Sequence, residues 1–176
     1  QDTPETNSSG TVQSKAENKD SRKVDLATIN ETIERFEIAF AKHIRKKRIE
    51  VLRSANGIIL RMPLKKAFQR KKPRFRKSYA KVMRVVRNML ADSSLPIIVS
   101  CHTDDQKPPG KHRSNWTYSS SCAGHVARSV LRKDVIVSER LKVQAFAGTR
   151  PLQPNTSKAG REKNRRIEIE LVFSPE

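Results

Sequence analysis

The sequence has few residues of several kinds. Its 176 residues include two cysteines, one tryptophan, two tyrosines and six glycines, and 18 acidic residues stand against 37 Lys and Arg. Two cysteines are too few for a disulfide scaffold, so they do not fix the redox compartment. No run approaches the roughly 18 apolar residues of a membrane helix, and no signal-peptide pattern is present. Because the chain does not begin with Met, we expect any anchor or export signal to lie upstream.

The excess of basic residues gives a formal net charge of +19. Such a field attracts polyanions but does not define a fold. The densest basic segment, residues 65–77, also contains Phe68 and Phe75. This combination suits single-stranded nucleic acid, which binds through stacking and charge. We favour the alternative that both rings anchor the core and that the charge belongs to a solvated surface, so we do not expect a nucleic-acid partner.

The chain divides into a polar start and a longer patterned part. Residues 1–23 are polar, with Val12 as the only large apolar side chain, so they are predicted to form a disordered linker. Apolar residues then recur at spacings of three and four, which predicts an amphipathic helix over residues 24–46 that leads into the domain. The domain itself is expected to occupy residues 47–176.

Helix and strand patterns alternate along this domain. Asn56-Gly57 lies between two alternating apolar runs and predicts a β-hairpin. Further apolar patterns predict helices over about 78–90 and from near Ser119, and strands near 97–99, 141–145 and 167–171. Residues 155–166 are interpreted as a long loop. The predicted fold class is α/β, an α+β sandwich with helices packed on a mixed parallel and antiparallel sheet.

Three sequence blocks resemble a known family. They are Cys101-His102-Thr103-Asp104, Ser114-Asn115-Trp116, and Gly160-Arg161 followed by Asn164-Arg165-Arg166. In this order they resemble the OmpA-like peptidoglycan-binding domain, in the form found in the MotB/PomB subunit of the flagellar motor stator. The resemblance covers about residues 49–173. It implies an OmpA-like fold that is not an enzyme and needs no cofactor.

The resemblance also implies a biological role. The expected function is non-covalent binding of peptidoglycan, through the diaminopimelate of its stem peptide, to anchor a stator in the cell wall. The implied partners are a second copy of the chain and an ion-channel subunit of the MotA/PomA type. The implied location is the periplasm, attached to the inner membrane through an upstream segment. Alternatives are a wall anchor of another envelope machine, such as a type VI secretion subunit, or a basic nucleic-acid-binding module.

Asp104 is the central residue of the expected site. It directly follows a predicted buried strand, where α/β sheets usually place ligands, and a carboxylate beside an amide suits an ammonium group. By resemblance, the residues expected to bind peptidoglycan are Thr103, Asp104, Asn115, Tyr118, Cys122, Arg161 and Arg165. The alternative for Asp104 and Asn115 is that they only hold the loop.

Both cysteines depart from the family pattern. Cys101 stands where Gly is usual, and Cys122 stands where an Arg usually meets the ligand's carboxylate. Losing that charged hydrogen bond costs about 1.5 to 3 kcal/mol, so binding should be weaker unless Arg113, Arg161 or Arg165 reaches in. We expect two buried free thiols, with a Cys101–Cys122 disulfide as the less favoured alternative. No metal site is expected, because Cys101 and His102 would point to opposite faces of a strand.

Overall fold

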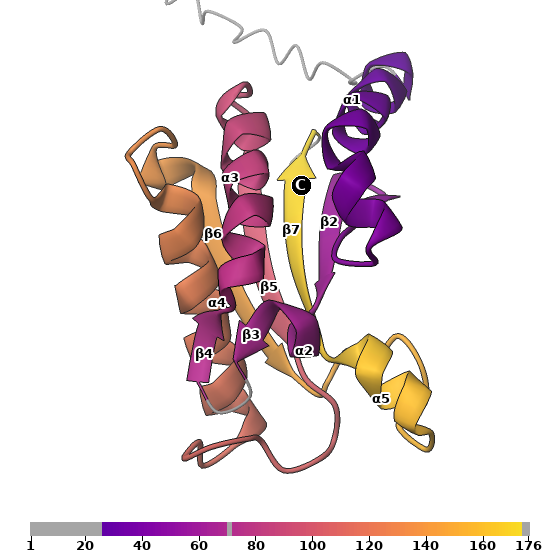
Figure 1. Cartoon of the computed structure of the whole chain (residues 1–176), viewed down its shortest axis with the longest axis vertical. Coiled ribbons are helices and arrows are strands. Elements are labelled where there is room, and N and C mark those ends of the chain that lie inside the picture. The colour runs from indigo at the N-terminus through magenta and orange to yellow at the C-terminus, as the bar shows by residue number, and fades with distance from the viewer. Residues whose placement is uncertain (1–25, 70–71, 174–176) are drawn as a thin grey trace, which may run out of the picture.

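The structure is a computed structural model that describes residues 26–69 and 72–173. The linker predicted over residues 1–23 lies outside these described residues. Five strands form one mixed sheet with the order β1-β2-β7-β5-β6 (Figure 1). The strands are β1 (Glu50–Arg53), β2 (Gly57–Pro63), β5 (Ile97–His102), β6 (Leu141–Ala147) and β7 (Arg166–Val172). The pair β5 and β6 is parallel and the other pairs are antiparallel, which confirms the predicted mixed sheet.

Three longer helices pack on one face of this sheet (Figure 1). They are α1 (Leu26–Arg45), α3 (Lys77–Ala91) and α4 (Asn115–Leu131). Between β2 and α3 lie a short helix and a small hairpin, α2 (Leu64–Ala67), β3 (Phe68–Gln69) and β4 (Lys72–Phe75). A 3-10 turn (Ser138–Arg140) precedes β6, and α5 (Lys158–Asn164) precedes β7. No helix within the described ranges combines the length and apolar character needed to cross a bilayer.

The core lies between the sheet and these helices. The register sets Leu60 beside Ile169, and Ile169 beside Val99, so buried apolar side chains from three strands form a continuous row. Alternation along a strand turns every second side chain to this face. The predicted anchor role of Phe68 and Phe75 is confirmed, because Phe68 is buried and the two rings stack with centroids 4.6 Å apart.

The opposite face of the sheet carries a charged cluster. Glu168 Oε1 accepts hydrogen bonds of 2.8 Å from Nε of both Arg61 and Arg166, and its Oε2 lies 3.4 Å from Nε2 of His102. Burial alone would raise the pKa of Glu168, but the nearby His102 imidazole, the hydrogen bond from Arg166 and the charges of Arg166 and Arg61 hold it well below its usual range. The middle of the sheet is therefore held by an ionised carboxylate on one face and by apolar packing on the other.

Helix boundaries differ from the sequence prediction at two places. Helix α4 begins at Asn115, one turn before the predicted start near Ser119, because Ser114 and Thr117 form a reciprocal capping box. The interpretation of residues 155–166 as a long loop is wrong, since α5 occupies most of this segment behind an N-cap at Ser157. Both helices begin at a small hydroxyl residue that accepts a backbone hydrogen bond.

The prediction of two free thiols is also wrong. Cys101 of β5 and Cys122 of α4 form a disulfide, with Cα atoms 6.2 Å apart, and both residues are fully buried. The two positions that depart from the family pattern are thus joined to each other. The sequence could not decide this, because a disulfide requires a Cα separation that only the packing of α4 on β5 sets.

Candidate functional site

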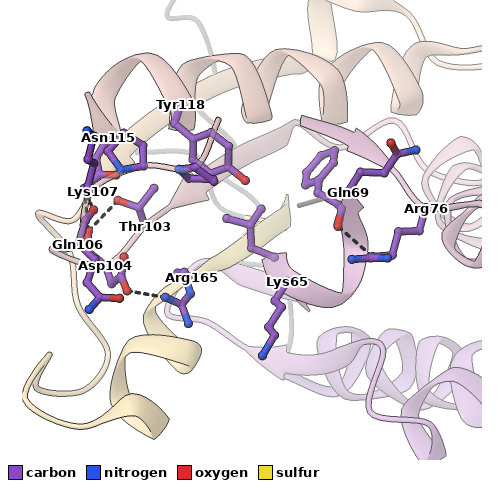
Figure 2. Close-up of a pocket in the computed structure, with 14 residues that line it drawn as sticks. Lys65, Gln69, Arg76, Thr103, Asp104, Gln106, Lys107, Asn115, Tyr118 and Arg165 are labelled. Carbon is purple, nitrogen blue, oxygen red and sulfur yellow. Dashed lines mark hydrogen bonds and ion pairs between the residues drawn. The ribbon is translucent and has the colours of Figure 1, made fainter. Parts of the chain in front are cut away.

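A cavity of about 530 Å³ lies at the carboxyl end of β5 (Figure 2). Three parts of the chain build its wall. The first is the segment around α2 and β3, the second is the loop after β5 with the start of α4, and the third is the junction of α5 and β7. The lining residues are Leu64, Lys65, Phe68, Gln69, Arg76, Thr103, Asp104, Gln106, Lys107, Pro108, Pro109, Asn115, Tyr118 and Arg165.

Asp104 and Arg165 form the charged centre of this cavity. Nη1 of Arg165 lies 2.6 Å from Oδ2 of Asp104, and Figure 2 shows the two side chains pointing toward each other. The Asp104 side chain is 5% exposed, whereas that of Arg165 is 27% exposed. A charge-assisted bond of this length is strong. The guanidinium, being the more exposed partner, keeps donors available for a ligand.

Backbone and amide hydrogen bonds hold the Asp104 loop in place. The backbone N–H of Thr103 donates to the carbonyl of Ala147 at 2.7 Å. The Asn115 amide donates to the carbonyls of Asp104 and Gln106, at 3.1 and 2.8 Å. Gly148 lies so close to the Asp104 carbonyl that a Cβ there would come within 2.7 Å of its oxygen. The loop-holding alternative is therefore observed for Asn115, while the Asp104 carboxylate faces the cavity.

Tyr118 closes one wall of the cavity from the first turns of α4. Burial raises the pKa of its hydroxyl, although the charge of Arg165 acts in the opposite direction. The ring is almost fully buried and makes an edge contact with His112 at 5.0 Å between centroids. A neutral phenol in this position can donate one hydrogen bond to a bound group.

One whole wall of the cavity was not predicted from the sequence. Lys65 comes from α2, Gln69 from β3 and Arg76 from the N-cap of α3, and Arg76 Nε donates to the Phe68 carbonyl at 2.9 Å. The basic composition of residues 65–77 was a signal, but it could not indicate a cavity formed with a loop more than 25 positions away. Together with Lys107 and Arg165 these cations outnumber Asp104, so the cavity favours ligands that carry carboxylates.

Two expected site residues do not line the cavity. The Cys122 side chain is buried in the disulfide beneath it. Arg161 instead donates from Nη1 to the Asn155 carbonyl at 2.6 Å, which fixes the loop before α5. The structure therefore brings together Thr103, Asp104, Asn115, Tyr118 and Arg165, and leaves Cys122 and Arg161 as supports. Within the described ranges, no group of three or more His, Cys, Asp or Glu residues is arranged to hold a metal ion.

These features define a class of protein: a mixed-sheet domain with helices on one face and a carboxylate and a guanidinium in a cavity at a strand end. The chain belongs to the OmpA family, whose sequence pattern matches residues 67–165. No curated protein sequence matches the chain.

Solved structures share this fold. A MotB-like protein from Desulfovibrio vulgaris is 23% identical, with a TM-score of 0.75 over 85% of this chain and 94% of that one. The cell wall anchor of the type VI secretion system from Pseudomonas aeruginosa is 21% identical, with a TM-score of 0.70 over 77% and 95%. The periplasmic domain of Helicobacter pylori MotB is 19% identical, with a TM-score of 0.63 over 72% and 83%. The fold is thus that of MotB-like domains, as the sequence blocks predicted.

Proposed function

We propose that this chain is a peptidoglycan-binding wall anchor of the bacterial periplasm and that the cavity at Asp104 binds the diaminopimelate of a stem peptide. The observation that carries the proposal is the Asp104–Arg165 pair inside a cavity of about 530 Å³. Membership of the OmpA family and the likeness to a cell wall anchor and to MotB domains support it. A binding role also agrees with the expectation that the chain is not an enzyme.

The chemistry of the pair suits an amino acid that carries both charges. An ammonium group of the ligand would pair with Asp104, and a carboxylate would pair with Arg165, so each buried charge exchanges one partner for another. This exchange matters because a buried carboxylate left without a partner is costly. Arg165 thereby supplies the guanidinium that the family pattern places at position 122, where this chain has a disulfide-bonded cysteine.

Asp104→Ala tests this site. The variant should no longer pellet with purified diaminopimelate-type sacculi, while its thermal unfolding midpoint should change little because Arg165 can turn to solvent. Asp105→Ala is the matched control, since Asp105 is an exposed carboxylate that does not line the cavity. Pelleting of the Asp104 variant at the level of the control would reject the site.

Sacculi whose stem peptides carry lysine in place of diaminopimelate test the finer identity of the ligand. Lysine has the same side-chain ammonium but lacks the second carboxylate. Loss of one charged hydrogen bond is worth about 1.5 to 3 kcal/mol, so lysine-type sacculi should bind roughly ten- to a hundredfold more weakly. Equal binding of the two would mean that Arg165 does not contact the ligand.

We further propose that the chain anchors a flagellar stator, as a homodimer joined to a MotA/PomA-type channel subunit. Helix α1 leaves Ile38 78% and Leu26 63% exposed, which suits a contact between two copies. Light scattering would give the mass of the dimer, and loss of swimming after removal of the domain from its own cell would identify the stator.

The likeness to the Pseudomonas anchor favours a type VI secretion role as the second candidate. Retained swimming together with loss of secretion would select that role.

The nucleic-acid alternative has less support. The Phe75 ring stacks between those of Phe68 and Tyr79, with centroids at 4.6 and 6.5 Å. Neither of the two phenylalanines is therefore free to stack on a base.

A further inference from the structure

A second hollow lies on the outer surface between α3 and α4, and we call it the basic groove. It encloses about 890 Å³ and is bordered by the end of β4, by α3, and by the second half of α4 with the turn that follows. It shares only Arg76 with the cavity at Asp104. Its other cationic side chains are Arg74, Lys77, Arg87, Arg128, Arg132 and Lys133.

Most of these cations lack an anionic partner. Asp134 is the one carboxylate among the lining residues. None of the ion pairs found in residues 26–69 and 72–173 involves a residue of the groove. Like charges facing one another across a hollow produce a positive potential that the domain itself does not neutralise. Such a potential favours a negatively charged partner.

Arg87 is a buried cation among the residues that line the groove. The residue is only 8% exposed, and its Nη1 donates to the Ser129 carbonyl at 3.0 Å. Burial first, and then the charges of Arg132 and Arg84, lower the pKa of its guanidinium. A carboxylate bound at this partly desolvated guanidinium would interact with it more strongly than in water.

Apolar side chains also line the groove. Met83 is buried, and Phe75, Ala80 and Leu131 also line the hollow. A ligand that carries only charge would leave this apolar surface in contact with water. The ligand that fits best has an apolar side for these side chains and carboxylates for the two rims, since arginine binds carboxylates through paired hydrogen bonds.

Two other polyanions fit the groove less well. Single-stranded nucleic acid needs free aromatic faces, but the Phe75 ring is already stacked between Phe68 and Tyr79. A flat anionic membrane would touch the exposed Arg128 and Arg132 but not the recessed Arg87 and Met83. Recessed charge and apolar side chains together favour an inserted peptide.

We propose that the basic groove docks an acidic amphipathic segment of a partner protein. Its apolar face covers the accessible Ala80 and Leu131. Its carboxylates pair with Arg128 and Arg132 on the α4 side and with Arg74 and Lys77 on the other. An amphipathic segment in a groove between two helices is a recurrent mode of peptide recognition. This docking is independent of the cavity at Asp104, so one face of the domain can bind cell wall while another holds a protein.

The test uses the whole chain and a peptide of about 18 residues, or five helical turns, built from Glu, Ala and Leu with Leu at spacings of three and four. A scrambled peptide of the same composition has the same charge but no apolar face. Titration at about 0.15 M ionic strength limits binding through the general field. The patterned peptide should bind at least tenfold more tightly than the scrambled one and should protect the amides of α3 and α4 from hydrogen exchange. Equal binding of the two peptides would overturn the proposal.

Charge reversal then locates the interaction. Arg128→Glu with Arg132→Glu should weaken peptide binding at least tenfold, because the two arginines that pair with the peptide's carboxylates are replaced by glutamates that repel them. Lys42→Glu with Lys46→Glu changes the net charge equally near the end of α1 and should change affinity less than about twofold. If the glutamate pair unfolds the protein, Arg128→Gln with Arg132→Gln removes the charges more gently and should show the same order. An equal loss in the Lys42 and Lys46 variant would reject the groove.

Competing ligands complete the test. Vesicles of anionic lipid and a single-stranded oligonucleotide are titrated under the same conditions. Either of them binding more tightly than the patterned peptide, with the same sensitivity to Arg128 and Arg132, would show that the class of ligand is wrong. Weaker binding of both supports a protein partner.

Discussion

Asp104 and Arg165 are 61 positions apart in the sequence, and their side chains meet at 2.6 Å. Asp104 is fixed because the backbone on both sides of it is hydrogen bonded, to Ala147 and to Asn115. Arg165 is positioned differently, at the point where α5 ends and β7 begins, and its own carbonyl accepts from the Leu64 N–H at 3.0 Å. The pair therefore links the loop after β5 to the last strand, and small shifts of either element change the cavity.

Arg165→Lys and Arg165→Met separate charge from geometry in ligand binding. Lysine keeps the charge but cannot make paired hydrogen bonds to a carboxylate, so it should bind diaminopimelate-type sacculi about tenfold more weakly. Methionine should lose more, since it also leaves Asp104 without a partner. Sedimentation with sacculi over a range of protein concentrations measures both effects. Full binding by the methionine variant would show that another residue binds the carboxylate.

Glu168 is the residue whose loss should most affect stability. Glu168→Gln leaves Arg166 without its carboxylate and Arg61 with only the exposed Glu50 at 4.0 Å, and breaking a buried pair in this way costs about 3 to 5 kcal/mol. Urea unfolding at neutral pH measures this loss. Adding Gln144→Glu to the Glu168→Gln variant should not restore the lost stability, because Gln144 contacts Ser100 and not the arginines. A variant as stable as the wild type would mean that solvent already screens the cluster.

The same cluster predicts how stability depends on pH. The pKa of Glu168 is lowered in the folded state, so its contribution is present above the unfolded value of about 4.3 and is lost as pH falls further. Burial also lowers the pKa of His102, with Glu168 opposing it, so protonation of the unfolded histidine begins to reduce stability below about pH 6.5. Unfolding free energies should therefore fall in two stages on acidification. In Glu168→Gln the stage below about pH 4.3 should be smaller.

At the scale of elements, the disulfide joins the two structures that deliver the site. Cys101 lies three residues before Asp104, and Cys122 lies one helical turn after Tyr118. The bond also closes the loop that contains Gln106 and Lys107 on the cavity rim. Its removal should therefore affect both stability and the order of the ligand loop.

Reduction of this disulfide should cost about 3 kcal/mol of stability, as expected for a loop of roughly 20 residues. Because both cysteines are fully buried, reduction requires prior unfolding or a strong reductant. The comparison is a urea unfolding curve of oxidised and fully reduced protein, with Cys101→Ala and Cys122→Ala as a thiol-free reference. Coincident midpoints for the oxidised and reduced forms would contradict the prediction.

Elements with regular patterns could be predicted, and those defined by local or distant contacts could not. Alternation at residues 167–171 and the Asn56-Gly57 turn gave β7 and the hairpin correctly, because burial on one face requires that period. The start of α4 was missed because Thr117, rather than a glutamate, completes the capping box. Helix α5 was missed because it is short and polar. The disulfide and the Lys65 wall depend on tertiary distances that no local pattern contains.

At the scale of the whole molecule, the net charge of +19 is distributed unevenly. The cavity contains one carboxylate opposed to several cations, whereas the basic groove contains cations with almost no partners. Both sites therefore attract anions, but only the cavity has the buried carboxylate needed to recognise an ammonium group. The general field and the specific site should respond differently to salt.

Sacculus binding measured at low and high salt distinguishes the two contributions. Raising ionic strength from about 0.1 M to 1 M shortens the Debye length from about 10 Å to 3 Å, so attraction through exposed cations is largely screened. Total binding should fall, but the preference for diaminopimelate-type over lysine-type sacculi should persist, because the Asp104 carboxylate is only 5% exposed and its pairing is screened less. The Arg128 and Arg132 charge reversal should lower binding at low salt and leave that preference unchanged. If the preference vanished together with the total binding at high salt, the wall would be held by the field of the whole molecule and not by the cavity.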